Sequence, residues 1–397
     1  WHIQRSRRFI IMSEFKASNF RDEFGNAGPD LVGITTMTSP YYFVPPSGST
    51  AERPQSPPPG MLRFNTDIGR LEVWRNDHWA TILGESPNLG NQNAAAAESP
   101  TGTGTRGLYA GVQSPTKTIG YITIETLGNI ADFGDLNTQR HNGVSSNSSR
   151  TRAIFGGGVS NSTLEFVTFA STGNGTSFGN LVSSNAREGG RGLSNSTRGI
   201  QFGGFDRPNS FAYSAEMGYI TMASTGNAQD FGDLSGFSTN YDAGINGSVR
   251  GVLAGSGVVS NTAANVCHYV TMSTTGNTQN FGDLTVQRLN GASGASSATR
   301  GVIAGGRVVP GSINNIEFIT IASTGNAQDF GDLTAVVNYG MGGSSTTRGI
   351  FTAVNPAFVS NYVTIASTGD GTDFGEIGVL TLSLLDGQIA SNGHGGL

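Results

Sequence analysis

Short hydrophobic runs separated by turn-forming residues recur along the chain from residue 105 onward. In one copy, residues 300–306 (Arg-Gly-Val-Ile-Ala-Gly-Gly) precede residues 317–323 (Glu-Phe-Ile-Thr-Ile-Ala-Ser) and residues 324–333 (Thr-Gly-Asn-Ala-Gln-Asp-Phe-Gly-Asp-Leu). Short alternating or β-branched runs bounded by Gly, Asn and Ser are typical of β-strands joined by tight turns. The pattern therefore predicts an all-β protein.

The same pattern occurs six times. The arginine that opens each copy recurs at intervals of 46 to 52 residues, and the Phe of the closing Phe-Gly recurs at intervals of 44 to 53 residues. The arginines are Arg106, Arg152, Arg198, Arg250, Arg300 and Arg348. Repeats of about 40 to 50 residues are typical of four-stranded propeller blades. We therefore expect residues 105–397 to form a six-bladed β-propeller of kelch-like architecture.

The strands of one copy have an expected order. The Arg-Gly strand is predicted to lie nearest the propeller axis, because small residues and glycines suit a crowded position. The Tyr/Phe-Ile/Val-Thr strand comes second, and the Phe-Gly-Asp-Leu segment and the Ser/Gly-rich run after it supply the third and fourth strands. Residues 386–393 match the run that precedes the other opening arginines. We expect this last segment to pair beside Arg106 and close the ring.

The chain before the repeats divides into three segments. Residues 1–59 are expected to form an extended arm, because the prolines at 45–46 and 57–59 remove amide donors. Residues 60–83 contain three strand-like runs separated by turns, which predicts a small three-stranded β-meander. Such a unit needs packing against another chain or domain. Residues 84–104 are interpreted as a linker.

Aromatic residues in the N-terminal part are candidates for anchoring the protein to a partner. Tyr41, Tyr42 and Phe43 precede the Pro-rich stretch, and Trp74 and Trp79 lie in the predicted meander. Such rings suit insertion into a partner's groove, and a local packing cluster is the alternative.

Composition narrows the range of functions. A charged content of 13%, a formal net charge of −5 and only two lysines give no basic track for nucleic acid. No apolar run approaches the roughly 18 residues of a membrane-spanning helix, so no membrane insertion is expected. The single cysteine, Cys267, is interpreted as a small buried hydrophobe rather than a reactive thiol.

The repeated polar residues have structural and functional interpretations. Acid pairs such as Asp329 and Asp332 offer fewer oxygens than the about six to eight that Ca²⁺ takes, so capping of the Phe-Gly bend is favoured. No metal or cofactor is expected. Each opening arginine is predicted to bond to carbonyls or to an Asp of Phe-Gly-Asp, and an anion site at the axis is the alternative.

The pattern gives little support for catalysis. Asp-Phe-Gly matches a kinase motif, but the Gly-rich loop, catalytic loop and lysine that a kinase needs do not accompany it. The five histidines show neither metal-ligand nor triad spacing. Glu188 and Glu216, two acids outside the repeat pattern, remain as candidates for glycoside hydrolysis. We expect a protein that is not an enzyme.

Recognition is expected in the connections that differ most between copies, because loops on a rigid scaffold commonly carry binding residues. These connections follow the Arg-Gly strand. Their aromatic candidates for ligand binding are Phe205, Phe211, Tyr213 and Phe358. Aromatic residues among polar neighbours suit a sugar or protein surface, and plain variation in loop length is the alternative.

Two motifs carry a resemblance to known proteins. The run Gly60-x-x-Arg-Phe-Asn-Thr-Asp-x-Gly-x-Leu-Glu-Val-Trp74, closed by Trp79, resembles the short β-meander of tailed-phage fibre and other virion structural proteins. The Thr-Gly-Asn-Ala-x-Asp-Phe-Gly-Asp-Leu repeats are similar to those in structural proteins of cyanophages. The resemblance implies a bacteriophage virion protein on the exterior of the particle, on its tail or capsid. It also implies contacts with other virion proteins through residues 12–83, and a homotrimer as in many fibre proteins.

The repeats and the resemblance together predict host attachment. In this interpretation the chain is a tail fibre or baseplate-associated adhesin whose propeller contacts a host envelope glycan or protein. A decoration or cement protein with a purely architectural role is the main alternative. A glycan-cleaving spike is the third.

Overall fold

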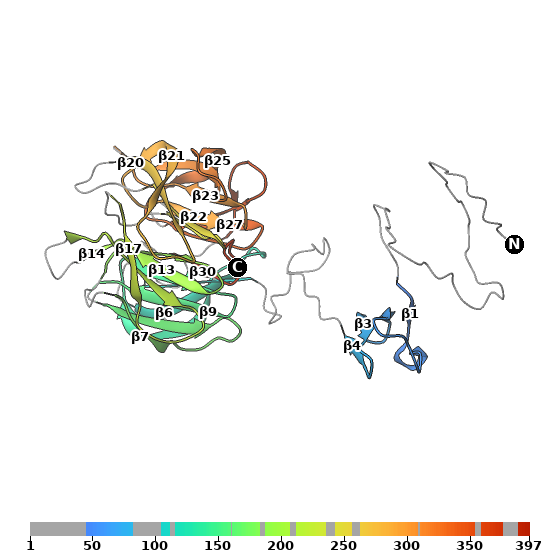
Figure 1. Ribbon diagram of the computed structural model, residues 1–397. Coiled ribbons are helices and arrows are strands. Elements are labelled where there is room, and N and C mark those ends of the chain that lie inside the picture. Colours follow the sequence, from blue (N-terminus) through green and yellow to red (C-terminus); the bar gives the residue numbers. More distant parts are fainter. Residues whose placement is uncertain are drawn as a thin grey trace, which may run out of the picture. The chain divides into compact units, whose positions relative to one another are not determined.

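The computed structural model describes residues 45–81, 105–111, 116–159, 161–182, 187–206, 212–235, 243–255, 263–308, 310–353, 359–375 and 388–397. The chain divides into two compact units, residues 1–85 and 86–397, and each is described by itself. The described residues form seven four-stranded sheets, one two-stranded hairpin and one short 3-10 helix (Figure 1). The predicted all-β class is confirmed.

The first unit is a four-stranded sheet in the order β1-β2-β3-β4. Its elements are β1 (Ser47–Gly48), the 3-10 helix η1 (Thr50–Glu52), β2 (Leu62–Asn65), β3 (Arg70–Trp74) and β4 (Trp79–Thr81). Strands β2, β3 and β4 form an antiparallel meander, and β1 adds a parallel fourth strand that the sequence pattern did not predict. The amide of Phe64 donates to the carbonyl of Pro46 at 2.8 Å. A proline lacks the donor but keeps the acceptor, so a Pro-rich stretch can still border a sheet.

The second unit contains six four-stranded antiparallel sheets in its described part, numbered here by the order of their opening arginines. Sheet 1 is β30 (Ala390–Ser391), β5 (Arg106–Ala110), β6 (Thr116–Thr123) and β7 (Ala131–Arg140). Sheet 2 is β8 (Val144–Ser148), β9 (Arg152–Gly157), β10 (Thr163–Thr168) and β11 (Thr176–Asn180). Sheet 3 is β12 (Arg191–Ser194), β13 (Arg198–Phe202), β16 (Glu216–Thr221) and β17 (Gln229–Asp233).

The remaining sheets repeat this arrangement. Sheet 4 is β18 (Ala243–Ile245), β19 (Arg250–Ala254), β20 (Ala264–Thr271) and β21 (Gln279–Arg288). Sheet 5 is β22 (Ser293–Ser296), β23 (Arg300–Ala304), β24 (Ile313–Thr320) and β25 (Gln328–Val337). Sheet 6 is β26 (Met341–Ser344), β27 (Arg348–Ala353), β28 (Val359–Thr364) and β29 (Thr372–Asp373). The hairpin is β14 (Phe205–Asp206) with β15 (Ala212–Tyr213).

Sheet 1 combines residues from both ends of the second unit. Strand β30 pairs with β5, with Ala390 opposite Leu108 and Ser391 opposite Gly107. This is the pairing beside Arg106 that the sequence predicted for the last segment. The first strands of the sheets contact one another in the series β8, β12, β18, β22, β26 and β30, and β30 also contacts β8. The series of first strands therefore returns to its starting point.

The order of strands within each sheet corrects the prediction. The Arg-Gly strand is second in every sheet, and the Ser/Gly-rich run before it is first. A Cβ atom added at Gly342 of β26 would lie 2.3 Å from the carbonyl oxygen of Gly294 in β22. Glycine alone permits backbones to approach this closely. The Ser/Gly-rich run therefore belongs to the sheet that follows its own copy.

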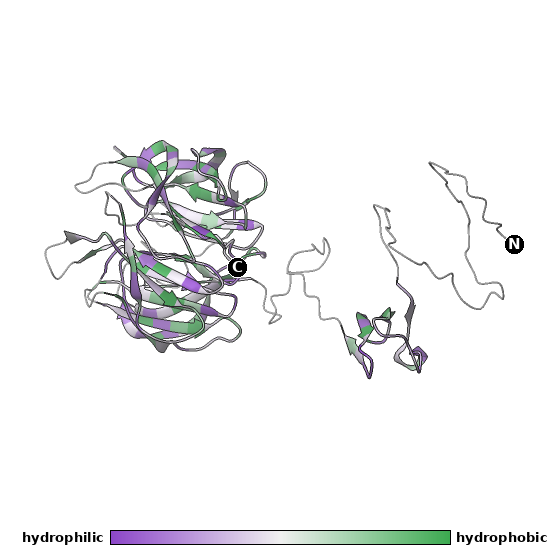
Figure 2. Cartoon of the chain, in the orientation of Figure 1, coloured by the Kyte–Doolittle hydropathy of each residue, from purple (hydrophilic) through white to green (hydrophobic). Residues whose placement is uncertain are grey.

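The core of the second unit lies between neighbouring sheets. The described residues form six clusters of buried apolar side chains, and each cluster joins two successive sheets. Ile245, Phe281 and Ile319 belong to the cluster between sheets 4 and 5, whereas Ile122 and Phe374 join sheet 1 to sheet 6. Figure 2 shows the corresponding alternation of hydrophobic and hydrophilic residues along the strands. Burial of one such Phe side chain contributes about 2–3 kcal/mol.

Candidate functional site

The six opening arginines connect neighbouring sheets. Each begins the second strand of its sheet, and its Nη1 donates to backbone carbonyls at the end of the third strand of the next sheet. Arg250 donates to the carbonyl oxygens of Ile321 and Ala322 at 3.2 and 3.0 Å. The other acceptors are Phe169 for Arg106, Met222 and Ala223 for Arg152, Met272 for Arg198, Ile365 and Ala366 for Arg300, and Ile124 and Glu125 for Arg348. The sequence predicted that the arginines bond to carbonyls or to an Asp of Phe-Gly-Asp, and these acceptors are carbonyls.

Each guanidinium group also lies over an aromatic ring of its own sheet. The guanidinium carbon is 4.3 to 5.0 Å from the ring centroid of the Tyr or Phe in the third strand. The same ring meets the buried Phe of Phe-Gly at a centroid distance of 5.9 to 6.4 Å in a nearly perpendicular arrangement. Cation–π contacts contribute about 0.5–2 kcal/mol each. The arginines are therefore engaged within the scaffold.

The Thr-Gly-Asn turn is a second contact between sheets. The amide of Gly325 donates to the carbonyl of Phe281 at 2.8 Å, and the amide of Asp283 donates to Asn326 Oδ1 at 3.0 Å. Equivalent amide bonds join Asp135 to Asn174, Asn180 to Asn227, Asp233 to Asn277 and Asp332 to Asp370. A Cβ at Gly282 would lie 2.2 Å from the Gly325 carbonyl oxygen, which explains the repeated glycine.

The repeated acids form local caps in two copies. Asp230 Oδ1 accepts from the amide of Gly232 at 3.1 Å, and Asp373 accepts from Gly375 at 3.4 Å. This is the predicted Asx-turn geometry at the Phe-Gly bend. Within the described ranges, no group of three or more His, Cys, Asp and Glu side chains is placed to hold a metal ion.

Two buried ion pairs that the repeat pattern does not predict also join neighbouring sheets. Arg140 of β7 pairs with Glu165 of β10 at 2.9 Å, and Arg288 of β21 pairs with Glu317 of β24 at 2.5 Å. All four side chains are at most 3% exposed. The available signal was an arginine at the end of the long fourth strand in copies 1 and 4, followed by a glutamate in the next copy. Burial lowers the pKa of Arg140.

The variable connection of sheet 3 carries an aromatic pair. The rings of Phe205 and Tyr213 lie on β14 and β15, with centroids 5.9 Å apart and an interplanar angle of 64°. The side chain of Tyr213 is 37% exposed. Figure 1 shows β14 at the margin of the second unit. Phe211 and Phe358, the other candidates, lie outside the described residues.

In the first unit, the motif residues are held together by a buried carboxylate. Glu72 is fully buried and accepts hydrogen bonds from Arg53, Arg63 and Asn65. The bond from Arg53 lowers the pKa of Glu72 most. This network connects the segment after η1 to strands β2 and β3.

The tryptophans of the first unit form a pair next to this network. Trp74 and Trp79 are cross-strand partners with ring centroids 5.6 Å apart, and the guanidinium of Arg63 lies 5.8 Å from the Trp79 ring. Both rings are therefore engaged locally within the first unit. Tyr41, Tyr42 and Phe43 lie outside the described residues.

The residues considered for reactive chemistry have structural partners. Glu188 accepts from Asn142 Nδ2 at 3.1 Å, and Glu216 pairs with Arg187. Burial raises the pKa of the Cys267 thiol to about 12, which disfavours the nucleophilic thiolate.

Comparisons with other proteins provide no assignment. No protein-family model matches the chain, and no curated protein matches it. No helix of the described residues is long and apolar enough to cross a membrane.

Proposed function

We propose that the chain is a non-enzymatic virion protein that attaches a phage particle to the host envelope through a six-bladed β-propeller. The observation that carries this proposal is a division between shared and variable positions. The repeated Arg, Phe and Asn residues are used in contacts between sheets, whereas the aromatic pair of Phe205 and Tyr213 stands on an added hairpin. A half-buried Phe205 that supports an exposed Tyr213 on a rigid scaffold is a common basis for recognition of a sugar or protein surface.

Four observations support a ring of six blades in residues 105–397. Strand β30 completes sheet 1 beside β5. The first strands contact one another in a series that returns to β8. One apolar cluster joins sheet 6 to sheet 1. The guanidinium of Arg348 in sheet 6 donates to the carbonyl of Ile124 in sheet 1.

The first unit is proposed to bind other virion proteins at the exterior of the particle. Its resemblance to fibre meanders supports this role, as does an apolar sheet face. The pairing registers place Leu62, Phe64, Leu71, Val73 and Ala80 on the face opposite Glu72. The side chain of Leu62 is 38% exposed on this face. A homotrimer, as in fibre proteins, is part of the proposal.

The test uses the full-length chain labelled with a fluorophore and incubated with host cells. We expect the wild type to bind and Tyr213→Ser to reduce binding at least tenfold. Leu127→Ser is the matched control, because Leu127 is also an exposed apolar residue of the second unit, at 62% exposure.

Three results would contradict attachment or the part that the hairpin has in it. Absence of cell binding together with uniform labelling of the capsid lattice would support the decoration protein instead. Equal loss of binding in both variants would remove the role of the hairpin. Release of reducing ends from host glycan would support a glycan-cleaving spike.

A further inference from the structure

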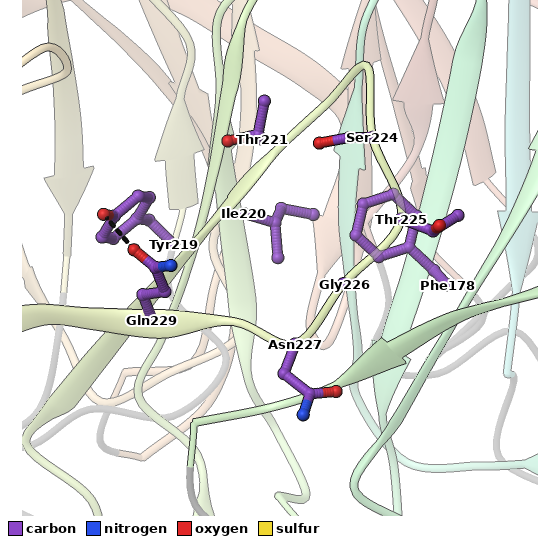
Figure 3. Close-up of a pocket in the computed structure, with 9 residues that line it drawn as sticks. All are labelled: Phe178, Tyr219, Ile220, Thr221, Ser224, Thr225, Gly226, Asn227 and Gln229. Carbon is purple, nitrogen blue, oxygen red and sulfur yellow. Dashed lines mark hydrogen bonds between the residues drawn. The ribbon is translucent and has the colours of Figure 1, made fainter.

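Equivalent hollows lie beside the Thr-Gly-Asn turns of sheets 3, 4 and 5. Their volumes are about 150, 80 and 270 Å³ respectively. Each is lined by the third-strand aromatic, the Thr at the end of that strand, the turn residues and a glutamine. Figure 3 shows the hollow of sheet 3, with Tyr219 and Gln229 on one side and Phe178 of sheet 2 on the other. Because one water occupies about 30 Å³ of liquid, the first hollow has room for about five waters, or part of one sugar ring.

The glutamine distinguishes these three copies from the other three. Gln229, Gln279 and Gln328 each lie opposite the third-strand aromatic in the sheet register. The same register position is held by Ala131, Thr176 and Thr372 in sheets 1, 2 and 6. Folding of a sheet therefore does not require glutamine at this position, in contrast to the arginine and the Phe that all six copies share.

The hydrogen bond made by the glutamine sets the direction of its amide group. The Tyr219 hydroxyl donates to Gln229 Oε1 at 2.5 Å, and Tyr269 makes the same bond to Gln279. An oxygen held by the phenol leaves the NH₂ group directed away from the ring, and Figure 3 shows the Gln229 nitrogen on the side of the hollow. The hollows of sheets 3 and 4 thus present an oriented amide donor beside an aromatic ring, whereas Gln328 of sheet 5 lies opposite Phe318, which has no hydroxyl.

The lining chemistry selects the class of ligand. None of the side chains that line the three hollows is charged; they are aromatic rings, aliphatic side chains, hydroxyls and amides. Phosphate, carboxylate and ammonium ligands would lose hydration without gaining an opposite charge. A neutral sugar presents hydroxyl groups that pair with amides and hydroxyls; because an arginine covers one face of each third-strand ring, these polar groups carry the selectivity.

We infer that these hollows are binding sites for single residues of a neutral glycan, with the glutamine amide as the donor that orients the sugar. This inference rests on the proposed attachment function and deepens it by naming the ligand class. A shallow site of this size binds one sugar weakly. Equivalent sites on three successive sheets raise the apparent affinity for a polymer by a factor of about 10² to 10⁴ when they bind together.

The first experiment measures saturation-transfer NMR on the full-length protein with glucose, galactose, mannose and N-acetylglucosamine. Glucuronic acid is the charged comparison. We expect saturation transfer to at least one neutral sugar and none to glucuronic acid. No transfer to any of the four neutral sugars, or equal transfer to glucuronic acid, would overturn the inference.

The second experiment measures binding of variants to an immobilised polymer of the sugar that responds. The variant Gln229→Ala/Gln279→Ala/Gln328→Ala is expected to bind at least tenfold more weakly. The control, Thr176→Ala/Thr372→Ala, changes the equivalent positions of sheets 2 and 6 and is expected to bind like the wild type. Equal binding by the glutamine variant and the wild type would overturn the inference, as would equal weakening in the control.

The outcome separates this inference from the proposed function. In one case, Tyr213→Ser weakens cell binding, and the glutamine variant binds both sugar and cells as the wild type does. The attachment function is then supported and the glycan sites are refuted. In the other case, the wild type binds neutral sugar through the glutamines but does not bind cells. The glycan sites are then supported and the attachment function is refuted.

Discussion

The guanidinium of Arg348 donates to the carbonyl oxygen of Ile124 at 3.0 Å, although Ile124 lies 224 positions earlier in the chain. This contact joins sheet 6 to sheet 1. It has the same geometry as the contact between Arg300 and Ile365, which joins sheet 5 to sheet 6. One side chain type thus connects consecutive copies and also connects the last copy to the first. The repeat of the arginine follows from this role, because each sheet needs one such link to the next.

Removal of the Arg348 side chain is expected to destabilise the second unit. Arg348→Met loses charge-assisted bonds to Ile124 and Glu125 and the contact with the Tyr362 ring. We expect a loss of about 3 kcal/mol in the free energy of unfolding, measured by urea denaturation. Arg150→Met, at an exposed arginine of the same unit, is the control and should change stability by less than about 0.5 kcal/mol. Equal stability of both variants would show that the contact is dispensable.

The buried pair of Arg288 and Glu317 predicts a non-additive response. Glu317→Leu leaves the fully buried guanidinium without its counter-charge, so we expect a loss of about 3–5 kcal/mol. The double variant Arg288→Met/Glu317→Leu removes both charges and should recover most of that loss. Urea denaturation of the two single variants and the double variant measures the coupling energy. Additive losses in the double variant would contradict the pairing.

The sequence predicted the repeats well because each copy carries its own turn and strand signals. The pairing of β30 was predictable because the run around Ala390 matches the runs that precede the other opening arginines. The first and second strands could not be ordered from the pattern, since Gly294 and Gly301 both indicate crowding. The order of these two strands depends on how closely the backbones of neighbouring sheets approach each other. The residue pattern of a single copy carries no information about that distance.

Contacts between copies were missed for the same reason. Glu317 meets Arg288 across two sheets, and neither residue is part of the six-fold pattern. The glutamines of sheets 3 to 5 were visible in the sequence, but their significance depends on the hollow that each one borders. The anchoring role of Trp79 stays a prediction; the structure adds that its ring lies against Trp74 and near Arg63.

The close approach of the first strands predicts strict intolerance of a methyl group. In Gly342→Ala, the new Cβ would meet the backbone oxygen of Gly294 at 2.3 Å, and backbone cannot rotate away as a side chain can. We expect a loss of about 3 kcal/mol or more and a lower midpoint of thermal unfolding. Gly173→Ala is the matched control, because a Cβ there would meet no atom within 4 Å. A similar midpoint for the two variants would refute the proposed packing of the first strands.

The buried His394 predicts a specific dependence of stability on pH. Its ring is 2% exposed, Nε2 lies 3.0 Å from the carbonyl oxygen of Ser148, and Nδ1 accepts from the amide of Gly396. Burial lowers the pKa of His394 from 6.5 to about 4, and the charge of Arg150 acts in the same direction. As the pH falls, His394 therefore binds a proton in the unfolded chain at a higher pH than in the folded protein. Stability from the neutral ring is fully present above pH 6.5 and is lost as the pH falls toward 4, by about 3 kcal/mol.

Comparison of variants isolates this contribution from that of the carboxylates, which titrate in both proteins. Urea denaturation of the wild type and His394→Gln should give a stability difference that is largest above pH 6.5 and narrows toward pH 4. Glutamine keeps hydrogen-bonding groups but has no proton to gain in this range. A constant difference between wild type and His394→Gln across this range would show that the ring does not titrate with folding.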